Sequence, residues 1–330
     1  MLKRQIVCFC LVLVCISPVF ASSWNKKDPL NTLKITPNLE KNRLSPYNFK
    51  DEFNYKNIEE LDEIYELAFE WKKGKYPKDN YELIEEKSGN KFIAITVKPN
   101  TNSHYDAYGD LKERGEINLP KVDLLEKEVW YGFRVRFPEG FEYNNSKYLK
   151  IHQLMDATEK AKQRSPRVSF NIRNSGNRFQ INGQFADLKS DPNKNCLKED
   201  GCYEKAFYGL NYDKSVYGVV VRKTNNKKAS GSSDFKFPSK GKWQIFKVGT
   251  FISRSDDGFV KIYQDDKQIF DYSGVTYDRK LKYYGTLLVI GGYRYGTKTN
   301  GGFPPQTIHF DDLTVVSSKE MLDKQLISAK

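Results

Sequence analysis

The sequence predicts an all-β protein, an antiparallel sandwich of the jelly-roll type with an N-terminal extension. Three observations favour this fold. Short segments of alternating apolar and polar residues recur from residue 80 onward, and a period of two is that of a half-buried strand. Gly, Asn and Pro separate these segments, as they do in turns. Aromatic residues make up 14% of the chain, which allows a large core although only 38% of the residues are hydrophobic.

The chain begins with a segment typical of a secretory signal peptide. Lys3 and Arg4 precede a short apolar run at residues 6–14, and cleavage is expected after Ala21. The apolar run is short for a membrane-spanning helix. We therefore expect residues 1–21 to be removed and the protein to be periplasmic or secreted, without membrane attachment afterwards.

The rest of the chain is predicted to hold one domain. Residues 22–57 are rich in Asn, Lys and Pro and are interpreted as an N-terminal extension. Residues 58–330 are assigned to the jelly roll, because no internal repeat or linker divides them. Within them, residues 58–71 have helical spacing, although a strand is the alternative for the second half.

The strands can be placed in chain order. Residues 81–86 and 91–97 flank Ser-Gly-Asn, which indicates a hairpin. Residues 130–137 alternate, so that Phe133 and Val135 face one way and Arg134 and Arg136 the other. The further predicted strands are residues 168–173, 179–182, 243–251, 259–264, 268–272, 287–290 and 307–316.

Two of the five cysteines remain after removal of the signal peptide. Cys196 and Cys202 lie in the segment CLKEDGC, and in an exported protein they most simply pair as a local disulfide. A metal site is less favoured, because no His or further Cys lies near them in sequence.

The charge predicts an anionic partner. The chain has 54 Lys and Arg against 42 Asp and Glu, a net charge of +12, and 52 basic residues remain without the signal peptide. Nucleic acid is disfavoured by the export signal and by the lack of a recognition motif. Phosphate-loop and dinucleotide motifs are also absent. From the charge alone, anionic lipid and acidic polysaccharide both remain open as partners, and we expect the protein to be a monomer.

Candidate functional residues lie on the polar faces of predicted strands. If residues 148–155 form a strand, Lys150 and His152 share one face, while Ile151 and Gln153 lie on the other. Other strands offer similar polar faces, which carry Asn171, Arg173, Gln180, Tyr293 and Tyr295. A polar sheet face of this kind is suited to an extended carbohydrate chain.

The sequence resembles polysaccharide lyases of the heparin lyase I and glucuronan lyase type, and more distantly jelly-roll alginate lyases. The order and spacing of the matching motifs hold over residues 80–316, most of the mature chain. Those motifs are Arg114-Gly115-Glu116-Ile117, Trp130-Tyr131-Gly132-Phe133, Ile151-His152, Gly241-Lys242-Trp243, Gly291-Gly292-Tyr293-Arg294 and Ile308-His309-Phe310-Asp311-Asp312.

This resemblance implies a concanavalin-like jelly roll that cleaves a uronate-containing polysaccharide by β-elimination. A base removes the C5 proton, an acid protonates the leaving oxygen, and a cation stabilises the charge that develops on the carboxylate. The resemblance assigns His152 and Tyr293 as base and acid, and which of them is the base depends on the stereochemistry of the sugar. It assigns Arg114 as a carboxylate contact, with an ion pair to Glu116 or another acid of the sheet as the alternative. The further substrate contacts expected are Asn171, Arg173, Gln180, Tyr295 and Arg294, with a structural role as the alternative for Arg294.

The chain departs from the family pattern at two positions. Lys150 stands where the family has Gln, and Val289 where it has Lys. A lysine is able to neutralise the carboxylate as a point charge, so we include Lys150 among the catalytic residues. The alternative is a non-catalytic carbohydrate-binding protein on the same scaffold.

The remaining histidines and acids are assigned no catalytic role. We expect His104 to lie in an exposed loop and His309 to be structural. No cofactor is predicted, although acids in turns sometimes hold calcium; the acids in question are Asp256, Asp257, Asp265 and Asp266.

Overall fold

The structure is a computed structural model, and it describes most of the chain after residue 47. The described residues are 48–62, 64–67, 78–99, 104–105, 111–119, 123–142, 148–156, 166–173, 178–185, 206–213, 218–223, 229–231, 236–274, 276–277, 283, 285–295 and 303–327.

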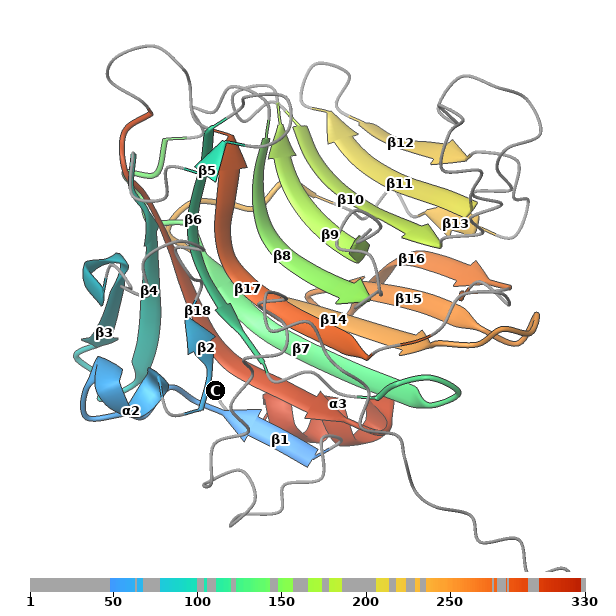
Figure 1. Ribbon diagram of the computed structural model, residues 1–330, viewed down its shortest axis with the longest axis horizontal. Coiled ribbons are helices and arrows are strands. Elements are labelled where there is room, and N and C mark those ends of the chain that lie inside the picture. Colours follow the sequence, from blue (N-terminus) through green and yellow to red (C-terminus); the bar gives the residue numbers. More distant parts are fainter. Residues whose placement is uncertain are drawn as a thin grey trace, which may run out of the picture. The chain divides into compact units, whose positions relative to one another are not determined.

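Two antiparallel sheets form the fold and confirm the predicted all-β jelly roll (Figure 1). Sheet A runs in the order β13-β16-β15-β14-β7-β18-β4-β3, and β1 pairs with β18. Its strands are β1 (Asn48–Asp51), β3 (Tyr81–Glu85), β4 (Lys91–Val97), β7 (Glu128–Arg136), β13 (Ala229–Gly231), β14 (Gln244–Phe251), β15 (Phe259–Gln264), β16 (Lys267–Ser273) and β18 (Gln306–Val316).

Sheet B runs in the order β12-β11-β10-β9-β8-β17-β6-β2, and β5 pairs with β6. Its strands are β2 (Glu66–Leu67), β5 (His104–Tyr105), β6 (Leu111–Asn118), β8 (Tyr148–Asp156), β9 (Pro166–Arg173), β10 (Arg178–Phe185), β11 (Ala206–Asp213), β12 (Gly218–Lys223) and β17 (Thr286–Tyr295). Each strand predicted from alternation is present, with ends shifted by a few residues.

The inner faces of the two sheets enclose one large apolar core. Phe133 on β7 and Phe246 on β14 meet Phe170 on β9, whose ring lies 4.9 Å from that of Phe246. Arg134 and Arg136 lie on the opposite face of β7, where they pair with acids. The alternation read in this segment is therefore confirmed.

Among the described residues, three short helical segments accompany the sheets: α2 (Ile58–Asp62), the 3₁₀ turn η2 (Lys78–Asn80) and α3 (Lys319–Ile327). Leu322 and Leu326 of α3 pack against Trp130 and Val316 on the outer face of sheet A. None of the described helices has both the length and the apolar composition of a membrane span.

The N-terminal part of the sandwich starts earlier than expected. Strand β1 falls inside the predicted extension (22–57), yet it pairs with β18 along its whole length. The sandwich therefore begins no later than Asn48, before the predicted boundary at 58. In the segment 58–71, helix α2 is followed by the short strand β2, which agrees with the alternative of a strand in the second half.

Candidate functional site

Three polar side chains lie in a row on the neighbouring strands β6, β17 and β8 of sheet B. Tyr293 on β17 is paired in register with Arg114 on β6 and with Lys150 on β8. The guanidinium of Arg114 lies 4.7 Å from the centroid of the Tyr293 ring, and the Lys150 ammonium lies 5.5 Å from it. Two cations therefore flank one phenol ring on adjacent strands. With Glu116 and Gln153, described below, these residues form what we call the polar face.

A local irregularity in β17 presents Tyr293 to this face. The pairing of β17 with β8 shifts register between Ile290 and Tyr293. Gly291 in this interval has a φ of +125°, and a Cβ at this position would lie 2.3 Å from the carbonyl oxygen of Gly115. Only glycine fits this close approach of two backbones.

A β-bulge in β8 changes which side chains reach the polar face. In the pairing with β9, Lys150 faces Asn171 and His152 faces Phe170, so Ile151 is one residue in excess. Ile151 and His152 both point into the core, and Gln153 joins Lys150 on the polar face. The expectation that His152 shares a face with Lys150 is thus wrong, because a bulge breaks the period of two.

His152 lies between the two sheets and is only 1% exposed. The rings of Phe133 and Phe170 lie 5.0 Å from its own. Its Nδ1 lies 2.9 Å from the carbonyl oxygen of Val289 and must donate to it, so Nε2 accepts from the Tyr131 hydroxyl, also at 2.9 Å. Burial lowers the pKa of His152 to about 3. The imidazole is therefore neutral and bound on both nitrogens within the core.

Gln153 links the two cationic strands of the polar face. Its Oε1 accepts a hydrogen bond from Lys150 Nζ at 3.1 Å, and its Nε2 donates to Glu116 Oε1 at 2.9 Å. The other carboxylate oxygen of Glu116 lies 3.7 Å from Arg114 Nη1. Burial raises the pKa of Glu116, and the neighbouring Arg114, Lys150 and Gln153 oppose that rise.

Amide side chains continue the row beyond Lys150. Asn171 on β9 pairs in register with Lys150, and Gln180 on β10 pairs with Asn171. The Asn171 amide is buried and donates to Ser169 Oγ at 3.0 Å. Arg173 follows Asn171 by two residues on β9, and Tyr295 follows Tyr293 by two residues on β17. The side chains of Arg173 and Tyr295 are outside the described residues.

Arg294, expected among the substrate contacts, lies on the core side of β17. It is fully buried, with Nε 2.5 Å from Glu113 Oε2 on β6. Its remaining nitrogens donate to the carbonyl oxygens of Phe303 and Pro304 and to Gln306 Oε1. Since it follows Tyr293 directly, alternation turns it away from the polar face, and it ties β6 and β17 to the start of β18.

The other expected sites lie apart from the polar face. Among the described residues, no group of three His, Cys, Asp or Glu side chains is arranged to hold a metal ion. Asp266 binds Lys247 instead, and Asp265 accepts a hydrogen bond from the backbone of Ile245. His309 accepts from Arg136 on the outer face of sheet A, and burial lowers its pKa to about 4.

Two of the predicted features fall outside the described residues. These are the cysteine pair Cys196 and Cys202, and the signal peptide. The side chain of His104 is not described either, although its backbone forms part of β5.

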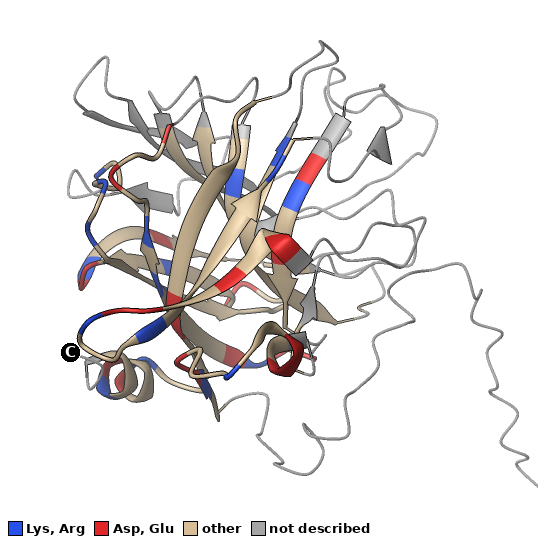
Figure 2. Ribbon diagram, turned by 90° about the vertical axis from the view of Figure 1, so that its left-hand side faces the viewer, with Lys and Arg blue, Asp and Glu red and all other residues tan. Residues whose placement is uncertain are grey.

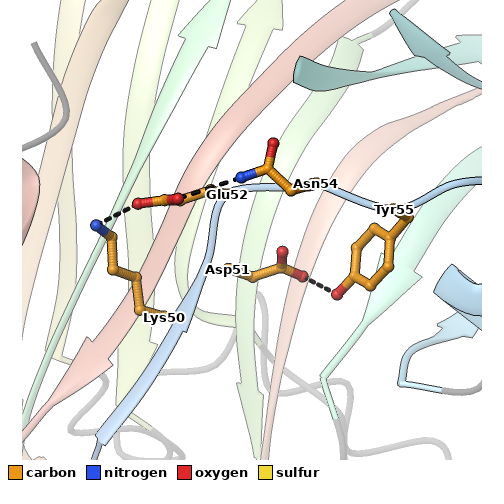
Figure 3. Close-up of a pocket in the computed structure, with 5 residues that line it drawn as sticks. All are labelled: Lys50, Asp51, Glu52, Asn54 and Tyr55. Carbon is orange, nitrogen blue, oxygen red and sulfur yellow. Dashed lines mark hydrogen bonds and ion pairs between the residues drawn. The ribbon is translucent and has the colours of Figure 1, made fainter. Parts of the chain in front are cut away.

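A pocket of about 310 Å³ opens beside β1, and no residue of the polar face lines it (Figure 3). Its wall is made by Lys50, Asp51, Glu52, Asn54 and Tyr55. These side chains mostly bond to one another: Lys50 pairs with Glu52, and Tyr55 donates to Asp51. Since one lysine and two acids line it, the pocket shows no concentration of positive charge.

Basic and acidic residues are also interspersed over the described strands and helices rather than separated (Figure 2).

Gln153 and Glu116 are the members of the polar face that the sequence does not identify as site residues. Simple alternation through Ile151 assigns Gln153 to the core side of β8. Nothing in the local sequence marks the bulge, although the paired glycines Gly291 and Gly292 of the adjacent strand signal irregular backbone there.

The structure is similar to several solved carbohydrate-active enzymes at low sequence identity. An endo-β-1,4-glucuronan lyase from the fungus Trichoderma reesei is 14% identical over 72% of this chain and 87% of that chain, with a TM-score of 0.48. An endo-1,3-β-glucanase from Streptomyces sioyaensis is 12% identical over 82% and 96%, with a TM-score of 0.46. Alginate lyase PA1167 from Pseudomonas aeruginosa is 13% identical over 74% and 88%, with a TM-score of 0.42.

Sequence comparison identifies the family directly. No curated protein is similar enough in sequence to count as a match. The family model described as polysaccharide lyase matches residues 68–314, which span β6, β8 and β17 and hence every residue of the polar face. Because this match covers most of the chain, the protein belongs to the polysaccharide lyase family.

Proposed function

We propose that this lyase cleaves a uronate-containing anionic polysaccharide by β-elimination on the polar face of sheet B. The observation that carries the proposal is the placement of Arg114 and Lys150 on two sides of Tyr293. When a uronate carboxylate binds between these cations, its sugar ring lies next to the phenol of Tyr293. Anionic character in the transition state is stabilised there by fixed positive charges.

Each group has a defined part in the proposed reaction. Arg114 and Lys150 bind the carboxylate and stabilise the enolate that forms when C5 loses its proton. Tyr293 is the proton-transferring group: its deprotonated phenolate takes the proton from C5 and becomes a neutral phenol. The phenol then gives this proton to the O4 oxygen as the C4–O4 bond breaks and the C4–C5 double bond forms, which regenerates the phenolate. His152 is left out, because its ring is buried and both of its nitrogens are bound.

The polymer is proposed to lie across the strands. Paired positions on β6, β17, β8, β9 and β10 carry Arg114, Tyr293, Lys150, Asn171 and Gln180 in one row. With neighbouring strands about 4.8 Å apart, this row extends over roughly 19 Å. Cations at one end and amides at the other provide partners for the carboxylates and hydroxyls of successive sugars.

The test is an ultraviolet assay for the unsaturated uronate product with heparan sulfate, glucuronan and alginate as substrates. The wild type should generate the chromophore with at least one polymer, and Y293F should lower kcat by about 100-fold or more. Y263F, which changes a tyrosine on sheet A, serves as the control. If Y293F turns over as fast as the wild type, the assignment of Tyr293 is wrong. If no polymer yields the chromophore but affinity gels show retardation, the protein binds such polymers without this chemistry.

Export is proposed with the function, because an extracellular polymer is the substrate. The N-terminal sequence carries the features of a signal peptide. Sequencing of the protein exported by its host should give Ser22 as the first residue. An intact Met1 in the exported protein would contradict cleavage.

Thiol titration under denaturing conditions should find Cys196 and Cys202 oxidised. Size-exclusion chromatography should give a monomer.

A further inference from the structure

The bridge from Lys150 through Gln153 to Glu116 admits few side chains at its centre. The Lys150 ammonium is only a donor and the Glu116 carboxylate is only an acceptor. The residue between them must therefore accept on one side and donate on the other, as the Gln153 amide does at 3.1 and 2.9 Å. A carboxylate lacks the donor and an apolar side chain lacks both. Gln153 is also only 6% exposed, so little water competes for these bonds.

The bridge ends on both cations that flank Tyr293. Glu116 accepts from Gln153 with Oε1, while its Oε2 faces Arg114 Nη1 at 3.7 Å. Lys150, Gln153, Glu116 and Arg114 thus form a continuous bracket across β8, β17 and β6 around the Tyr293 ring. A long lysine side chain loses much rotamer freedom when it is held in place, and the bracket supplies that restraint before substrate binds.

We propose that Gln153 is a positioning residue, which holds the Lys150 ammonium beside Tyr293 and is itself anchored by Glu116. This inference rests on the proposed function and deepens it, since it explains how a lysine in the position of the family glutamine is held at the site. Gln153 acts through Lys150 and does not touch the reacting atoms. Small displacements of a charged group from its working position are costly to rate.

The first experiment compares kcat and KM in a double-mutant cycle. Q153L should lower kcat by about 10- to 100-fold, and K150M should lower it at least as much. In the K150M background, Q153L should lower kcat much less than it does in the wild type, because the ammonium that Gln153 positions is gone and only its bond to Glu116 is still lost. Q268L, which removes an exposed glutamine on sheet A, is the control and should match the wild type. Effects of Q153L and K150M that multiply would overturn the proposal, since a purely structural role gives that result.

The second experiment uses Q153E, which keeps the size of the side chain if Q153L does not fold. At neutral pH the introduced carboxylate opposes Glu116 and cannot donate to it, so kcat should fall. At lower pH the protonated carboxyl again has one donor and one acceptor, and the ratio of Q153E to wild-type activity should rise. A ratio that does not change with pH would contradict the positioning role. Wild-type activity separates the two claims, because a wild type inactive on every polymer refutes the proposed function itself.

Discussion

Arg114 lies over the ring of Tyr293, with its guanidinium carbon 4.7 Å from the ring centroid, and the two residues are directly paired on β6 and β17. Strand pairing brings the two side chains close together, and their chemistry makes the contact a cation–π interaction between a guanidinium and a phenol ring. Arg114 is about one-third exposed, so it is held by Glu116 and Tyr293 while part of it still reaches solvent. That combination suits a group that must meet a carboxylate.

Substitution of Arg114 should therefore affect turnover more than folding. We expect R114Q to lower kcat/KM by about 10²- to 10³-fold, because a charged donor to the developing enolate is lost. R114K should fall between R114Q and the wild type, since it keeps the charge and loses the planar fork. The ultraviolet assay measures both, and K261Q on β15 controls for the loss of a cation elsewhere. Equal activity of R114Q and K261Q would show that Arg114 does not contact the substrate.

His152 should behave as a core residue. H152A removes two hydrogen bonds and leaves a cavity beside Phe133 and Phe170, so we expect a loss of about 2–4 kcal/mol in the free energy of unfolding. At a temperature where the variant is folded, kcat should stay within a few-fold of the wild type. Thermal unfolding and the ultraviolet assay check the two parts. A stable variant with abolished turnover would restore His152 as a catalytic residue.

The buried pair of Arg294 and Glu113 should be important for stability. Both side chains are fully buried, and removal of one partner leaves an uncompensated charge in the core. R294M should thus cost about 3–5 kcal/mol, and the double variant R294M/E113L should recover part of that loss. Denaturant unfolding gives both values. If R294M kept full stability but raised KM, Arg294 would have to reach the substrate after all.

Asp311 should make stability depend on pH. Burial, together with neighbouring Asp312, raises its pKa from 3.8 to about 6, against the opposing effects of Asn90 and Arg134. Between these values the folded protein binds more protons than the unfolded chain, so this group's stabilisation is lost as the pH rises from about 4 to about 6. D311N should remove the effect, which is about 3 kcal/mol. The measurement is the difference in unfolding free energy between the two proteins across this range, and a constant difference would contradict it.

Alternation was sufficient to predict most of the fold. It placed Phe133 and Val135 in the core and Arg134 and Arg136 outside, because β7 is regular throughout its length. Strands β1, β5, β6, β11, β12 and β13 were not predicted, and β2 lies where a strand was only the alternative. Strands β2, β5 and β13 have two or three residues, which are too few to show a period. Pairing with a neighbouring strand, rather than local pattern, defines such elements.

The site was predicted less well because it lies where the strands are irregular. Arg114, Tyr293 and Lys150 are brought together as expected, since β6 pairs regularly with β17. His152 and Gln153 exchange faces because β8 carries one extra residue opposite β9. Arg294 was misplaced for a different reason: a family motif names neighbouring residues together, whereas a strand sends them to opposite sides.

The extra residue Ile151 reverses the alternation of side-chain faces in the part of β8 that follows it. Residues before it keep the faces that simple alternation assigns, and those that follow, as far as Leu154, take the opposite ones. Without Ile151, Lys150, His152, Gln153 and Leu154 would alternate simply and keep the faces that they have now, with the histidine in the core and the glutamine on the polar face. A strand of the present length without the bulge would instead turn the histidine outward and carry the glutamine into the core. The backbone conformation at one residue thus decides which of the two side chains β8 offers to a ligand.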